Sequence, residues 1–107
     1  MHELEPSALA DFRAATPDAV LLDVREPFEY DLVHLDGAVL VPMTRLPAGI
    51  EKAIPDRTRP IIIYCHHGIR SVHAAAFLEH LGYEAVHNLT GGIDRLSIEV
   101  DPDVPRY

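Results

Sequence analysis

The chain has 107 residues, of which 48% are hydrophobic and 24% charged, and its formal net charge is −8. This length suits one domain with one core, since domains usually run to ~100–200 residues, so we expect residues 1–107 to form a single domain. The acidic balance argues against nucleic acid as a partner, because binding a phosphate backbone needs clustered Lys and Arg.

The start of the chain and its cysteine content bear on where the protein works. No apolar run approaches the ~20 residues of a membrane span, and the acidic start has no basic or apolar region typical of a secretory signal. We therefore expect no membrane partner. The single cysteine, Cys65, can form no internal disulfide. A lone thiol fits a reducing compartment, which predicts a cytoplasmic protein.

The sequence of the first half of the chain predicts short strands that alternate with short helices. Continuous apolar runs predict buried strands, and prolines mark the first turns of helices. In chain order we expect a strand ending at Leu4, a helix from Pro6 to residue 15, a strand over 20–23, a helix over 26–33 and a strand over 38–41. Over residues 44–54, Pro47 and Gly49 interrupt any long helix, so one or two helical turns are expected there.

The second half carries the strongest signals. Residues 61–64 follow Pro60 with three consecutive isoleucines, which indicates a central strand. A helix follows, because Ala74, Phe77, Leu78 and Leu81 recur at helical spacing and Gly82 is placed to end it. A last strand over 85–87, a turn at 91–92 and a helix over 93–98 complete the pattern. Alternating strands and helices predict an α/β fold with a parallel sheet covered on both faces.

Cys65 stands at the carboxyl end of the predicted central strand, where open parallel sheets bind their ligands. The loop after it turns sharply into a helix, which directs several backbone N–H groups and the positive end of the helix dipole at one point. Such a cradle favours a thiolate over a thiol. It can also hold a persulfide sulfur or an incoming oxyanion, so Cys65 is the candidate catalytic residue.

The other loop residues are candidate substrate-binding residues. Gly68 permits positive φ angles and leaves room for the cradle, and Arg70 offers a permanent charge and a planar fork for an oxyanion. His66 and His67 surround the entrance and add charge when protonated, with their rings expected to point in different directions. Ser71 is interpreted as a hydroxyl at the helix start, since no base lies near it to activate a nucleophile.

The loop His66, His67, Gly68, Ile69, Arg70, Ser71 together with Cys65 resembles the active-site loop of the rhodanese family. Two further segments match that family in the expected order. The first consists of Asp23, Val24, Arg25, Glu26, Glu29, Tyr30, His34, Gly37 and Ala38, and the second of Gly82, Tyr83, Asn88, Leu89, Gly91, Gly92 and Ile93. The sequence departs from the family at Leu96, where many relatives carry Trp, and at Val33, where Gly is common.

The resemblance implies a five-stranded parallel sheet of order 1-5-4-2-3 flanked by helices. It implies a sulfurtransferase in which Cys65 takes sulfur from a small anionic donor such as thiosulfate, carries it as a persulfide, and passes it to cyanide or to a thiol, including a protein thiol. No cofactor and no metal are implied. A tetrahedral site built from His66, His67 and Cys65 would also lack a second pair of suitably spaced ligands.

Two other functions remain open at this point. A cysteine phosphatase or arsenate reductase uses a similar cradle, but those enzymes need five residues between Cys and Arg, whereas four separate Cys65 from Arg70. A rhodanese-like module that binds a partner without turnover is the alternative from another class, although such modules usually lack the loop cysteine.

Charged residues outside the loop are given structural roles. Asp23 and Arg25 are expected to form an ion pair that ties a strand end to the following loop. Glu26, Glu29 and Asp31 are expected to form a solvated face.

Overall fold

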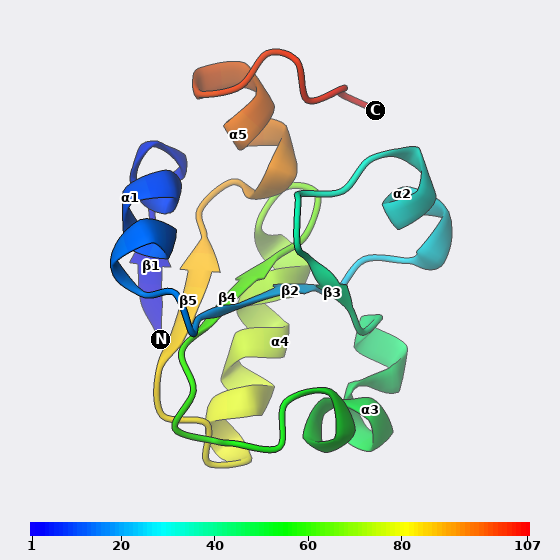
Figure 1. The fold of residues 1–107 in the computed structure, drawn as a ribbon. Coiled ribbons are helices and arrows are strands. Elements are labelled where there is room, and N and C mark those ends of the chain that lie inside the picture. Colours follow the sequence, from blue (N-terminus) through cyan, green and yellow to red (C-terminus); the bar gives the residue numbers. More distant parts are fainter.

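The computed structural model describes residues 1–107 as an open parallel sheet with helices on both faces (Figure 1). Five strands pair in the order β1-β5-β4-β2-β3, and every pairing is parallel. The strands are β1 (His2–Leu4), β2 (Val20–Asp23), β3 (Val39–Leu40), β4 (Ile61–Tyr64) and β5 (Val86–Leu89). This sheet order confirms the fold class predicted from the sequence.

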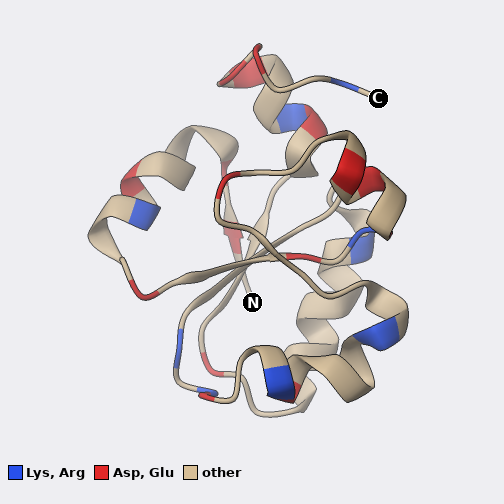
Figure 2. Ribbon diagram, turned by 45° about the vertical axis from the view of Figure 1, so that its right-hand side comes forward, with Lys and Arg blue, Asp and Glu red and all other residues tan.

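The helices connect the strands and cover the sheet. They are α1 (Leu9–Ala15), α2 (Pro27–Leu32), α3 (Leu46–Ala53), α4 (Ile69–His80) and α5 (Gly92–Glu99), with short 3-10 turns, η1 (Pro6–Ala8) and η2 (Met43–Arg45), before α1 and α3. No helix combines the length and the apolar character that a membrane crossing requires. Lys and Arg residues are spread over several elements rather than along one stripe (Figure 2).

Strand β4 divides its side chains between two hydrophobic cores. Ile61 and Ile63 pack with Ala74 and Leu78 of α4, on the face that α3 and α4 cover. Ile62 and Tyr64 point the other way, into a second core to which α1 and α5 contribute. Because alternate residues of a strand point to opposite faces, a strand buried on both faces must be apolar throughout, and the run of isoleucines meets that need.

Some boundaries differ from those expected. Residues 44–54 form more helix than predicted, because Pro47 lies in the first turn of α3, where a missing N–H costs no intrahelical hydrogen bond. The last strand runs on to Leu89, since parallel pairing with β1 reaches that far. The third strand is confined to Val39–Leu40. The predicted stop of α4 is confirmed: Gly82 follows the helix with a φ of +93°.

The predicted ion pair between Asp23 and Arg25 is confirmed. Both side chains are fully buried, and Arg25 Nη2 lies 2.6 Å from Asp23 Oδ2. The Arg25 backbone N–H also donates to this carboxylate, at 3.0 Å. Two charges taken out of water in this way must satisfy each other, so the pair fixes the chain where it leaves β2.

Candidate active site

Cys65 lies directly after β4, at the carboxyl edge of the sheet, as the sequence predicts. The loop that follows ends at Gly68, the N-cap of α4. Gly68 has a φ of +90°, a backbone conformation that residues with a side chain rarely adopt. A Cβ at Gly68 would come within 2.9 Å of the Gly91 backbone nitrogen. Glycine is therefore required here both for the turn and for the close approach of the segment that follows β5.

The sulfur of Cys65 is the focus of the loop's hydrogen-bond donors. The N–H of Gly68 donates to Sγ at 3.1 Å and the N–H of Ser71 at 3.3 Å. The thiol itself donates to Ser71 Oγ at 3.3 Å. The residue is only 1% exposed, so the side chain is deeper than a surface nucleophile, yet the surrounding amides are aimed at it. Such donors stabilise negative charge on sulfur.

The segment after β5 supports the cysteine loop through backbone hydrogen bonds. The N–H of Ile93 donates to the carbonyl of Cys65 at 2.9 Å, and that of Asp94 to the carbonyl of His66 at 3.0 Å. Gly92 packs so tightly here that a Cβ on it would lie 2.4 Å from the Cys65 carbonyl oxygen. The first turn of α5 thus holds the loop in place. The sequence predicted a turn at residues 91–92 but not this contact with the cysteine loop.

Glu29 does not belong to a solvated face, so that expectation is wrong. Its residue is 4% exposed, and its carboxylate binds Arg70 through two hydrogen bonds, Nη1 to Oε1 at 2.6 Å and Nη2 to Oε2 at 2.9 Å. The Arg70 hydrogen bonds hold the pKa of Glu29 down, at about 2. The fork of Arg70, which the sequence assigned to an oxyanion, is therefore engaged by a residue of α2.

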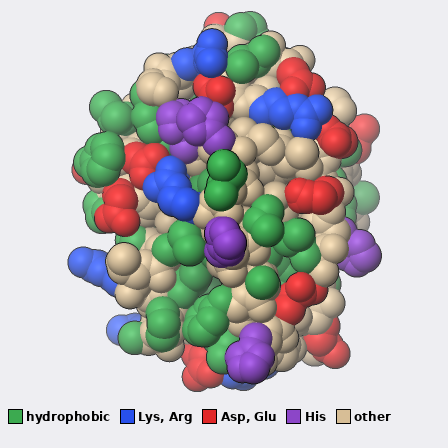
Figure 3. All heavy atoms as spheres, turned by 180° about the vertical axis from the view of Figure 1, so that it is seen from behind, with side chains coloured by type: hydrophobic (Ala, Val, Ile, Leu, Met, Phe, Trp, Pro, Cys, Tyr) green, Lys and Arg blue, Asp and Glu red, His purple; other side chains and the backbone are tan.

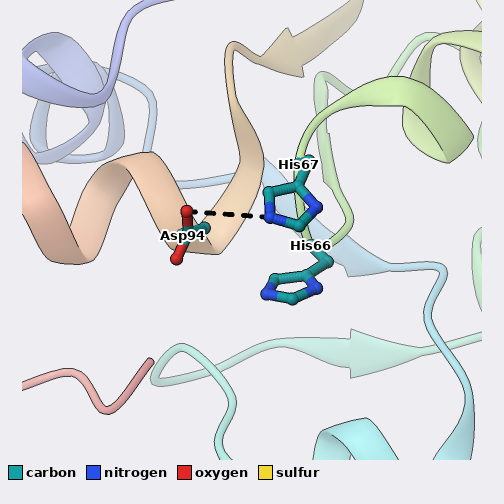
Figure 4. Close-up of side chains that lie close together, drawn as sticks. All are labelled: His66, His67 and Asp94. Atoms are coloured by element: carbon teal, nitrogen blue, oxygen red, sulfur yellow. Dashed lines mark ion pairs between the residues drawn. The ribbon is translucent and has the colours of Figure 1, made fainter. Parts of the chain in front are cut away.

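The two histidines stack on each other, contrary to the expectation that their rings diverge. The ring centroids of His66 and His67 are 3.9 Å apart. Figure 4 shows both rings beside Asp94 of α5, which lies 3.7 Å from His67 Nε2. Burial lowers the pKa of His66, which disfavours a positive charge on its ring. His66 Nε2 is buried and has no hydrogen-bond partner.

His66, His67 and Asp94 place potential metal-ligand atoms within 4.8 Å of one another. The Asp94 carboxylate, however, is paired with Arg106, whose Nε lies 2.8 Å from Oδ1. That hydrogen-bonded pairing also lowers the pKa of Asp94. Since a guanidinium occupies the side chain that a cation would need, the group is better described as an ion-pair cluster at the edge of the loop.

Ile69, Ser71 and Leu96 differ in how far they are buried. Ile69 is 71% exposed and opens α4 at the surface, whereas Ser71 is fully buried beneath the loop. Leu96, the departure from the common Trp, is buried in the core shared with Ile93 and Tyr64. Seen from behind, the surface of the molecule mixes hydrophobic side chains with histidine, basic and acidic ones (Figure 3).

Comparison with known proteins identifies the family. The model of the rhodanese-like domain matches residues 6–99, nearly the whole chain. The chain belongs to the rhodanese family. A rhodanese from E. coli, solved with anions, is 33% identical and superimposes with a TM-score of 0.67 over 71% of this chain and 89% of that one. A rhodanese-related protein from Thermoplasma volcanium is 27% identical, with a TM-score of 0.79 over 94% of both chains.

Two longer proteins are also similar to this chain. The probable adenylyltransferase/sulfurtransferase MoeZ of Mycobacterium tuberculosis is 34% identical over 104 residues, which are 97% of this chain and 26% of that protein. A tRNA uridine(34) hydroxylase of Erwinia tasmaniensis is 37% identical over 81 residues, 72% of this chain and 23% of that protein. The chain spans about a quarter of the length of these relatives. It is therefore a rhodanese-like domain with sulfurtransferase-related homologues.

Proposed function

We propose that this rhodanese-like domain is a sulfurtransferase that carries a sulfane sulfur on Cys65 as a persulfide. The observation that supports this most directly is the position of Sγ, which two main-chain N–H groups and a hydroxyl approach within 3.3 Å. Donors fixed by the backbone stabilise a thiolate without reorganising. The same donors suit the negative charge of a persulfide terminus.

The reaction has two displacement steps. The Cys65 thiolate attacks the outer sulfur of a donor such as thiosulfate; the sulfur–sulfur bond of the donor breaks, and sulfite leaves with the electron pair. An acceptor nucleophile, cyanide or a thiol, including a protein thiol, then attacks the terminal sulfur of the persulfide, and Cys65 leaves as a thiolate. No net oxidation occurs and no cofactor is needed, so this is covalent catalysis with ping-pong kinetics.

We assign substrate binding to residues 66–71. Gly68 and Ser71 supply donors at the sulfur, and the Ser71 hydroxyl can reverse its direction and donate once the thiol has lost its proton. Arg70, although paired with Glu29, keeps N–H groups and partial exposure that can attract an anion. His66, His67 and Ile69 surround the approach.

Two of the similar proteins support this reading. MoeZ carries the word sulfurtransferase in its name, and the E. coli rhodanese was solved with anions. The presence of a tRNA uridine hydroxylase among the relatives means that the domain serves different chemistries, so we extend only the sulfur-carrying step to this chain. A persulfide works among thiol acceptors, which fits the reducing cytoplasm.

Intact-mass spectrometry after thiosulfate treatment tests the proposal. Cys65 is the only cysteine, so an added mass of one sulfur can be assigned without digestion. We expect this adduct in the wild type, its removal by cyanide, and its absence in Cys65→Ser. An unchanged mass in the folded wild type would instead favour a partner-binding module without turnover.

A phosphatase assay separates the other alternative. With only four residues between Cys65 and Arg70, the loop has too few donors to surround a tetrahedral phosphate. We expect no hydrolysis of an aryl phosphate. Turnover that disappears in Cys65→Ser would replace the sulfurtransferase assignment with a phosphatase.

A further inference from the structure

The last residues of the chain lie across the carboxyl edge of the sheet, between α5 and α2 (Figure 1). Arg106 is bound to Asp94 of α5. Tyr107 is bound on the opposite side, where its hydroxyl accepts a hydrogen bond from Arg25 Nη1 at 2.8 Å and donates one to Glu29 Oε2 at 2.7 Å. The segment is therefore anchored at both sides of the edge at which Cys65 lies.

Tyr107 also covers the cysteine loop. Its ring stacks on His66, the residue after Cys65, with a centroid separation of 3.9 Å and an angle of 8° between the rings. His66 Nε2 is sealed from solvent in this arrangement. The three hollows on the surface are lined by other residues, and none of them includes Cys65. Cys65 itself is 1% exposed, so the sulfur is covered in this conformation.

We infer that residues 104–107 form a strap over the active site, and that Tyr107 determines how large a molecule can reach the Cys65 sulfur. In combination with the proposed function, on which this part rests, Tyr107 sets the size of the acceptor that can collect the persulfide sulfur. Small nucleophiles need only a slight displacement of the ring. A bulky thiol needs the strap to leave.

The strength of the contacts is suited to such a role. Tyr107 is 40% exposed, and two part-buried hydrogen bonds, one with the Arg25 guanidinium and one with the Glu29 carboxylate, hold its ring down. The side chain of Arg106 is 61% exposed, and an ion pair in that setting is weak. The strap is thus ordered in the folded protein but can open without unfolding the sheet.

Alkylation of Cys65 by reagents of two sizes tests the strap without relying on sulfur transfer. The rates of modification by iodoacetamide and by a bulky fluorescein maleimide are measured in the wild type, Tyr107→Ala and Tyr107→Phe. Loss of the ring and its hydrogen bonds should raise the maleimide rate about tenfold or more, since ~1.4 kcal/mol of lost closure corresponds to a factor of ten. The iodoacetamide rate should rise much less.

The phenylalanine variant keeps the ring on His66 but loses both hydrogen bonds, so its rates should lie between those of the other two proteins. Tyr30→Ala is the matched control, because Tyr30 also stacks on a histidine, His34, at 3.8 Å, but its hydroxyl binds the carbonyl of Ala38 rather than a residue of the site. It should leave both rates unchanged. A ratio of the two rates that stays the same in Tyr107→Ala overturns the strap, whether both rates are unchanged or both rise equally. A Cys65 that neither reagent modifies in Tyr107→Ala also overturns it, because removal of the ring should then have opened the site.

The two proposals can fail separately. If thiosulfate yields a persulfide but the ratio of alkylation rates does not respond to Tyr107→Ala, the strap is wrong and the sulfurtransferase stands. If the ratio responds but no persulfide forms, Tyr107 controls access to a cysteine with another task. If both hold, the variant should raise transfer to a bulky thiol relative to transfer to cyanide.

Discussion

Replacement of Gly92 by alanine should damage the active site through the backbone alone. The new Cβ would lie 2.4 Å from the Cys65 carbonyl oxygen and 2.6 Å from the His66 carbonyl carbon. Neither atom can move without displacing the loop that holds the sulfur. The same carbonyls accept the hydrogen bonds from Ile93 and Asp94, which the displacement would break or lengthen.

The cost has two parts that the chain allows to be separated. Gly92 has a φ of +64°, and a left-handed conformation costs a residue with a side chain about 1–2 kcal/mol. Overpacking against a rigid backbone adds about 1–3 kcal/mol. We therefore expect Gly92→Ala to lower the free energy of unfolding by about 2–5 kcal/mol.

Gly82→Ala provides the matched control. Gly82 has a φ of +93°, but its Cβ would come no closer than 3.6 Å to Arg57 Cδ, which is ordinary van der Waals contact. This variant carries the conformational cost with little of the overpacking, so the expected loss is about 1–2 kcal/mol, or a fall in melting temperature of about 5–10 °C.

Urea unfolding of the two variants and the wild type measures the difference, and iodoacetamide modification of Cys65 reports on the loop. Gly92→Ala should be the less stable variant and should change the modification rate, while Gly82→Ala should keep the wild-type rate. Equal losses of stability, with the same modification rate in both, would refute the idea that Gly92 supports the loop through backbone contact.

Three further predictions concern the polar groups around the cysteine. Asp23→Asn should lower the free energy of unfolding by about 3–5 kcal/mol in urea titrations, because it leaves the fully buried Arg25 guanidinium without its counter-charge. A loss of about 1 kcal/mol or less, which is typical of exposed ion pairs, would contradict this prediction. The pKa of Glu29, about 2 against an ordinary 4.5, predicts that its pairing with Arg70 stabilises the fold fully above pH 4.5 and loses that effect as the pH falls toward 2. At neutral pH the free energy of unfolding of Glu29→Gln should be about 1–3 kcal/mol lower than that of the wild type, after allowance for the exposed side of Arg70. This difference should disappear in acid, and a difference that does not change with pH would count against the pairing. Ser71→Ala removes the hydroxyl but keeps the backbone N–H at the sulfur, so the rate of persulfide formation should fall only about three- to tenfold, and a complete loss would show that the hydroxyl has a larger role.

The parts of the site that follow one another in the chain could be predicted from the sequence. The isoleucines of β4, Gly68 and the apolar stripe of α4 specify a strand, a turn and a helix within 20 residues. Residues this close determine one another's backbone through local sterics and burial. The location of Cys65 at the sheet edge follows from that local pattern and the parallel sheet.

The contacts between distant segments could not be predicted in this way. Glu29 and Arg70 are 41 positions apart, and Tyr107 lies 82 positions from Arg25. A glutamate on a short helix beside other acidic residues has the pattern of a solvated surface, and only the packing of α2 against the loop buries it. The tail with its two prolines gave no signal of a contact with the site, since it has no periodicity from which a buried face can be inferred.

The arrangement around the sulfur explains why a net charge of −8 is compatible with the anion-binding site that we propose. The groups that approach Sγ are two backbone amides and a neutral hydroxyl, and the Arg70 guanidinium is paired with Glu29. Oriented dipoles in a buried site act over short distances, so they stabilise an anion on Cys65 whatever charge the distant surface carries. The acidic residues beside the site then serve to hold Arg70 and Tyr107 in place, and the chemistry depends on the geometry of the main chain.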